Sequence, residues 1–114
     1  MAEYKRRVTH YIRVMERRVG GLQKNVEDWT TEYTNWSSEA QRLEGLRGEL
    51  TPNWPLPQRE SALWHARERA VAAQERRDWY EGDLKKAEVD LERYRQFRIS
   101  LDLQTRYSKK TAKD

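Results

Sequence analysis

Residues 8–43 read VTHYIRVMERRVGGLQKNVEDWTTEYTNWSSEAQRL and carry an unbroken heptad pattern. The residues that form the pattern follow one another at intervals that alternate between four and three. Because this alternation keeps them on one stripe of an α-helix, it predicts a coiled-coil helix about 40 residues long. The stripe consists of Val8, Ile12, Met15, Val19, Leu22, Val26, Trp29, Tyr33, Trp36, Ala40 and Leu43.

The same alternation returns between residues 63 and 101. The two series are separated by GELTPNWPLP, residues 48–57, whose three prolines cannot continue a helix. Two helices and one turn predict an all-α fold, an antiparallel two-helix coiled-coil hairpin. The second stripe consists of Leu63, Ala66, Ala70, Ala73, Arg77, Tyr80, Leu84, Ala87, Leu91, Tyr94, Arg98 and Leu101.

We expect a single helical hairpin over residues 1–114, because this length requires no second domain. The first helix should span about residues 3–47 and the second about residues 57–107, on either side of a turn at 48–57. A basic tail, residues 108–114, should fray from the end of the second helix.

A turn centred on Asn53 determines which residues face each other across the hairpin. Most of the bulky side chains then face small ones, as interdigitating layers require. This register also places Arg77 opposite Trp29, whose indole the guanidinium can cover. Arg98 falls near the open end, where its long stem can reach water.

Gly20 and Gly21 are the one local objection to a continuous first helix, because glycine costs roughly 1 kcal/mol in a helix interior. The heptad places Val19 in the core, so both glycines fall on the outer face. Since the stripe continues in phase on both sides, we expect one helix with a soft point rather than two helices.

A two-helix hairpin buries only one seam, so its isolated stability is close to zero by a crude balance of burial against conformational entropy. A protein partner or a second copy would help, and two hairpins can combine into a four-helix bundle. The outer face of the second helix offers a place for such contact. Apolar residues there follow one another at positions i, i+7, i+8 and i+15, which places them on one stripe of the helix. The candidate residues are Trp64, Val71, Ala72 and Trp79, with Trp54 in the turn.

Two other arrangements of these tryptophans are open at this point. Trp64 and Trp79 can fold down over the shoulders of the hairpin. Trp54 can plug the end of the seam instead of contacting a partner.

Basic side chains gather near both termini. Residues 1–26 hold seven basic and two acidic side chains, and residues 91–114 hold seven and three. The antiparallel pairing brings these segments together, and aromatic rings lie among the cations, as a single-stranded nucleic-acid surface requires. The candidate nucleic-acid residues are Lys5, Arg6, Arg7, Tyr11, Arg13, Arg17, Arg18, Lys109 and Lys110.

The sequence offers little for catalysis. His10 and His65 are the two histidines, and the predicted register places them near opposite ends of the hairpin, so they cannot share a metal ion. No P-loop, HExxH motif or nucleophile elbow is present. We therefore expect a protein that is not an enzyme, with no catalytic residue, metal, cofactor or small-molecule ligand.

The chain contains no cysteine, so a reducing compartment is permitted. No stretch approaches 18 consecutive apolar residues, and the N-terminus has no apolar run of the kind found in signal peptides. We expect a soluble cytoplasmic protein without membrane contact.

The layout resembles that of the export-stalk proteins of flagellar and type III secretion systems, which are small basic antiparallel coiled coils whose terminal end inserts into an ATPase ring. The likeness covers the two heptad series, the break at TPNWPLP and the basic tail SKKTAKD. It is architectural and transfers no residue-level motif. Residues 79–97, WYEGDLKKAEVDLERYRQF, also resemble the C-terminal coiled coil of the primosomal replication protein PriC.

Three classes of function follow. The first is a coiled-coil adaptor or stalk that docks a protein partner within a larger assembly. The second is a DNA- or RNA-binding accessory factor of the replication or regulation type that uses the basic end. The third is a structural coiled coil that assembles with itself.

Overall fold

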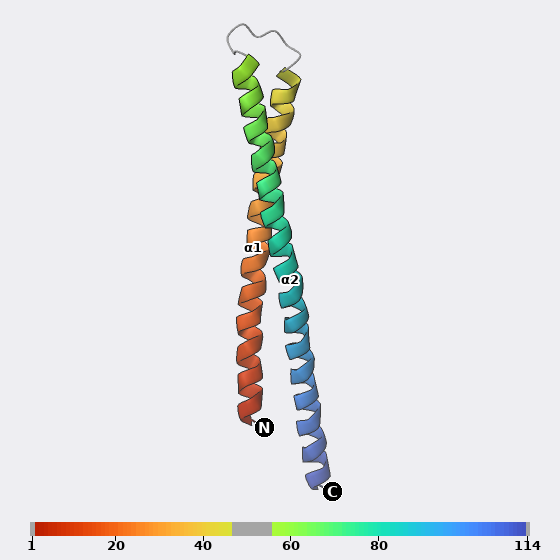
Figure 1. Ribbon diagram of the computed structural model, residues 1–114. Helices are drawn as coiled ribbons and strands as arrows, with labels where there is room; N and C mark the ends of the chain where they lie inside the picture. Colours follow the sequence, from red (N-terminus) through yellow and green to blue (C-terminus); the bar gives the residue numbers. More distant parts are fainter. Residues whose placement is uncertain (1, 47–55, 114) are drawn as a thin grey trace. The chain divides into compact units, whose positions relative to one another are not determined.

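The structure, a computed structural model, describes residues 2–46 and 56–113, with side chains at 2–46 and 60–107. These residues form two helices and no strand: α1 spans Ala2–Leu46 and α2 spans Leu56–Lys113 (Figure 1). The predicted all-α helical hairpin is therefore confirmed. The second helix is longer than expected, because α2 continues past residue 107 as far as Lys113.

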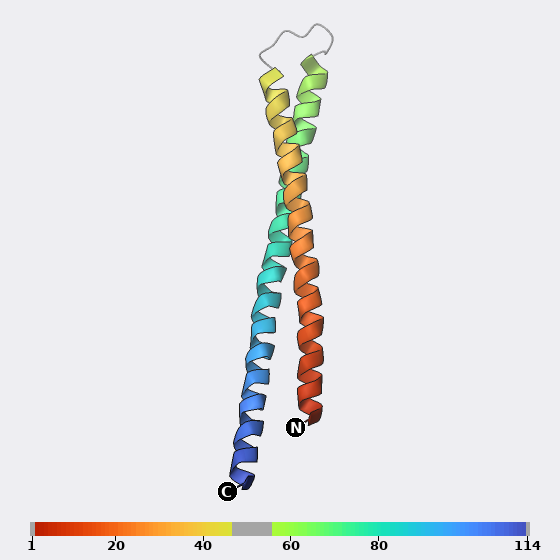
Figure 2. The same ribbon diagram turned by 180° about the vertical axis from the view of Figure 1, so that it is seen from behind.

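The chain divides into two compact units, and each pairs a segment of α1 with a segment of α2. Unit 1 comprises Met1–Gln23 and Gly82–Asp114, and unit 2 comprises Lys24–Glu81. In unit 1 the red-to-orange part of α1 lies beside the blue part of α2 in both Figure 1 and Figure 2. In unit 2 the orange-to-yellow part of α1 lies beside the green part of α2.

The core of unit 1 is a layer of apolar side chains between the two helices. Burial of these side chains provides most of the driving force for pairing, at about 25 cal/mol per Å² of apolar surface. The buried residues are Val8, Ile12, Val19, Ala87, Leu91 and Leu101, with Met15, Leu22, Leu84 and Tyr94 packed against them.

The core of unit 2 contains smaller side chains. Ala66 is 1% exposed, and Ala70 and Ala73 are also buried. One cluster comprises Leu43, Leu63 and Ala66, with Trp36, Ala40 and Ala62 packed against it. The predicted arrangement of aromatic residues on α1 against alanines on α2 is therefore confirmed at Trp36.

Ion pairs across the helices show that they are antiparallel in both units. In unit 1 Lys5 Nζ lies 3.1 Å from Asp102 Oδ1, so the start of α1 meets the end of α2. In unit 2 Arg67 Nη2 lies 3.2 Å from Glu44 Oε1, so the end of α1 meets the start of α2.

The heptad pattern identifies the core well. Every residue of the first stripe is buried or half-buried, and so is every residue of the second stripe except Arg98. Arg98 is exposed, which confirms the expectation that its side chain reaches water. Its long, charged side chain gains more from water than from the core, and Leu101 is the next buried residue of the stripe.

The predicted contact between Arg77 and Trp29 is wrong. The Arg77 guanidinium lies over the ring of Tyr33, 5.3 Å from its centroid, and Arg76 lies over Trp29 at 5.1 Å. Side chains on a helix lean toward its N-terminus. In an antiparallel pair this direction leads from Trp29 toward Tyr33, so Arg77 reaches one turn further along α1.

Gly20 and Gly21 lie within an uninterrupted α1. Both are exposed, and a Cβ atom built at either position has no neighbour within 4 Å. Neither has a positive φ, so the backbone conformation does not require glycine at these positions. The expectation that they fall on the outer face is confirmed.

We expect the double substitution Gly20→Ala/Gly21→Ala to raise the free energy of unfolding by roughly 1 kcal/mol per glycine. Alanine loses less backbone freedom than glycine on folding, and each added methyl group enters open space. Thermal unfolding followed by circular dichroism at low protein concentration measures the change.

Gly45→Ala is the matched control for this prediction. Gly45 also has open space around it, but it lies in the last turn of α1, where helices fray. Its substitution should have a much smaller effect. Destabilisation by the double substitution, or an equal gain at Gly45, would contradict the prediction.

Candidate docking site

The outer side of α2 in unit 2 carries large apolar side chains in solvent. Trp64 is 64% exposed, Val71 51% and Trp79 62%, and Ala72 is also exposed. We call these four residues the tryptophan face. The helical period places them opposite the buried alanines of α2, and the two tryptophans do not fold down over the helix pair. Trp54 lies outside the described residues.

Acidic residues lie between the two tryptophans on the same side of α2. Trp64, Glu68, Val71 and Glu75 follow one another at intervals of four, three and four. Glu68 and Glu75 are exposed, and neither forms an ion pair with another described residue. The tryptophan face therefore lies beside negative charge that has no ion-pair partner among the described residues.

A shallow hollow of about 400 Å³ lies beside Trp79. Its lining residues are Glu75, Arg76, Trp79 and Tyr80. The Trp79 and Tyr80 rings meet edge to face with centroids 4.9 Å apart, and Arg76 is held over Trp29. The hollow thus offers ring faces and one carboxylate.

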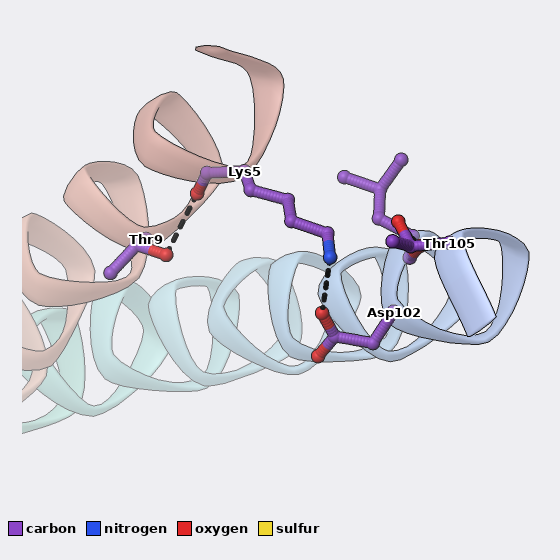
Figure 3. A network of polar contacts seen from close by, with 5 residues as sticks. Lys5, Thr9, Asp102 and Thr105 are labelled. Atoms are coloured by element: carbon purple, nitrogen blue, oxygen red, sulfur yellow. Dashed lines mark hydrogen bonds and ion pairs between the residues drawn. The ribbon is translucent and has the colours of Figure 1, made fainter. Parts of the chain in front are cut away.

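The basic residues of α1 differ in whether they already have partners. Lys5 pairs with Asp102, as Figure 3 shows, and its carbonyl oxygen accepts a hydrogen bond from the Thr9 hydroxyl. Arg7 pairs with Glu3 at 3.1 Å. Four other arginines are exposed and form no ion pair with a described residue: Arg6, Arg13, Arg17 and Arg18. The side chains of Lys109 and Lys110 lie outside the described residues.

Three of these free arginines share one line on α1 with a histidine. Arg6, His10, Arg13 and Arg17 follow one another at intervals of four, three and four, on the side of α1 opposite its buried stripe. We call these four residues the arginine stripe. The nearby Glu16 does not neutralise them, because its carboxylate faces Arg95 at 3.8 Å. Sequence reasoning missed this stripe, although its heptad spacing was a signal that could have revealed it.

A shallow hollow of about 400 Å³ lies on the arginine stripe. It is lined by Lys5, Arg6, Thr9, His10 and Arg13. Beyond the stripe lie Gly20 and Gly21, which have no side chains and leave open space at their Cβ positions.

Tyr11, a candidate nucleic-acid residue, uses one of its ring faces within unit 1. Its ring stacks on Tyr94 with centroids 5.7 Å apart and an interplanar angle of 18°. Tyr11 is still 50% exposed. The structure thus joins this tyrosine to the core of unit 1 while leaving part of its ring in water.

The histidine and acidic side chains of the described residues form no cluster suited to metal binding. No three His, Asp or Glu side chains among them are placed to hold a metal ion. His10 lies in unit 1, and His65 in unit 2 meets Trp36 edge to face. The hydrogen bonds from Arg42 lower the pKa of the half-buried Glu39 carboxyl below its usual value.

No helix within residues 2–46 or 56–113 combines the length and the apolar composition needed to cross a membrane. Comparisons with models of protein families, with curated proteins and with solved structures gave no match.

We expect acrylamide to quench the fluorescence of Trp64 and Trp79 several times more strongly than that of Trp36. Trp64 and Trp79 are exposed, whereas Trp36 is half-buried against the alanines of unit 2. The measurement uses three variants that each keep one tryptophan and carry phenylalanine at the other four, at low protein concentration. Equal quenching in all three would contradict the exposure of the tryptophan face.

Proposed function

We propose that this protein is a non-enzymatic adaptor or stalk that docks a protein partner through the tryptophan face. The exposure of Trp64 and Trp79 on the side of α2 away from its buried stripe is the observation that carries the proposal. We also propose a cytoplasmic location. The chain has no cysteine, which is compatible with a reducing compartment where disulfides are rare.

Two tryptophans on one helix face are well suited to protein recognition. Each tryptophan can bury about 150–250 Å² on contact, and tryptophan is among the residues that dominate the energetics of interfaces. Neither Trp64 nor Trp79 contributes to the apolar clusters of its own unit. Contact with another protein would bury their surface without disturbing the helix pair.

Two glutamates that form no ion pair with a described residue support a protein partner rather than a lipid surface. Glu68 and Glu75 lie between the tryptophans, and burying them in lipid would cost much free energy. A protein with cations at matching positions can satisfy both carboxylates. The partner surface should therefore be apolar at two points and basic between them.

The non-enzymatic character of the proposal is supported by the shape of the surface. The hollows on the arginine stripe and beside Trp79 are shallow and open to water. Catalytic sites usually exclude water from a concave pocket. The helix pair instead offers an extended docking surface.

We expect a photo-reactive phenylalanine analogue at Val71 to form a covalent adduct with another polypeptide when irradiated in the cells that produce the protein. Val71 lies on the tryptophan face between its two anchors. Denaturing electrophoresis followed by mass spectrometry detects the adduct and identifies the attached chain.

The same analogue at Gln74 is the matched control. Gln74 is exposed on the same helix, but it lies about 100° around the helix axis from the line joining the two tryptophans. It should give little or no adduct. Absence of an adduct at Val71, or equal labelling at both positions, would refute docking through the tryptophan face.

A further inference from the structure

The tryptophan face on α2 has the same length as the outer segment of α1 from Arg6 to Gly21. Trp79 stands at i+15 from Trp64, and Gly21 stands at i+15 from Arg6. At 1.5 Å per residue, both spans cover about 22 Å of helix axis. We infer that a second copy of this chain fills the tryptophan face with its arginine stripe. This inference rests on the proposed function and names the partner of the same site.

The two faces carry polar groups at matching positions, and at one of these positions the charges are opposite. When the spans are aligned, Glu68 and Glu75 stand opposite His10 and Arg17. When the direction of one helix is reversed, Glu68 stands opposite Arg17 and Glu75 opposite His10, so each glutamate still faces a residue of the arginine stripe. Glu68, Glu75 and Arg17 have no ion pair with another described residue. Opposite charges at matched heptad positions are a common device by which helices select their partners.

The two ends of the spans match as well. In either direction, one tryptophan meets Arg6 and the other meets Gly20 and Gly21. A guanidinium packs favourably on an indole face. At the glycines, the surface is open for a large ring, since no atom other than those of the adjoining residues and the local helix backbone lies within 4 Å of either Cβ position. Binding a tryptophan would give these glycines a role that offsets their cost to the helix.

The centres of the spans are compatible with close approach. Arg13 falls over Val71 and Ala72, so its aliphatic stem meets apolar groups while its guanidinium lies between the two opposing glutamates. The small Ala72 leaves room for the backbone of the second copy.

A nucleic acid is the competing occupant of the arginine stripe. Phosphates would neutralise Arg6, Arg13 and Arg17, and the nearby Tyr11 could stack on a base. They would leave the tryptophan face exposed and give its glutamates no partner. A second copy satisfies both faces at once, so we argue for the second copy and let the experiment separate the two.

The test uses sedimentation equilibrium of the full chain and two charge-reversed variants. R13E/R17E makes the arginine stripe acidic, and E68R/E75R makes the tryptophan face basic. Each variant alone brings like charges together, and its dissociation constant should rise about tenfold or more over wild type. An equal mixture brings opposite charges together at both contacts, so it should associate nearly as well as wild type.

R18E/R93E is the matched control for R13E/R17E. It removes the same amount of charge at exposed arginines that lie off the arginine stripe and have no ion pair with a described residue. It should associate like wild type. Circular dichroism of every variant shows whether the helices are retained, and recovery in the mixture excludes unfolding as the cause of any loss.

A monomeric wild type, or a mixture that associates no better than its separate components, would overturn the inference. Salt-dependent binding of single-stranded DNA by a monomeric wild type, lost in R13E/R17E, would assign the arginine stripe to nucleic acid instead. The failure of this inference can be distinguished from a failure of the proposed function. If the wild type is monomeric but Val71 cross-links to a different protein, docking through the tryptophan face stands and the second copy does not.

Discussion

Burial of one narrow apolar stripe on each helix is the interaction on which this structure depends. The stripe of α1 and the stripe of α2 provide the clusters around Leu91 in unit 1 and Leu43 in unit 2. Because the remaining surface of both helices is in water, the outer faces are free to carry other patterns. The tryptophan face and the arginine stripe are two such patterns, and neither is needed to hold the helices together.

The heptad spacing predicts the fold because it is a strictly local property. Each residue of the first stripe is placed by the helical period alone, and the structure buries or half-buries all of them. The same period gives the outward direction of Trp64 and Trp79. Their exposure, in contrast, depends on whether a large ring folds back over its own helix, which spacing does not determine.

Contacts between the helices were harder to predict because they depend on where each long side chain leans. Arg77 covers Tyr33 rather than Trp29, a shift of one turn, and Arg76 takes the place over Trp29. The arginine stripe was missed for another reason. Its arginines were counted among many basic residues, and only the pairing of Lys5, Arg7 and Glu16 with other side chains separates the free cations from the occupied ones.

The alanines of unit 2 have a consequence for how this protein can evolve. Ala66, Ala70 and Ala73 are buried where α1 and α2 meet, so a larger side chain at any of them would push the helices apart. Exposed positions that lie outside the tryptophan face, its glutamates and the arginine stripe are under no such restriction. Descendants of a common ancestor would then share few identical residues but keep the spacing of small ones. Relatives in such a lineage would be recognised by the volumes of their buried side chains rather than by identical residues.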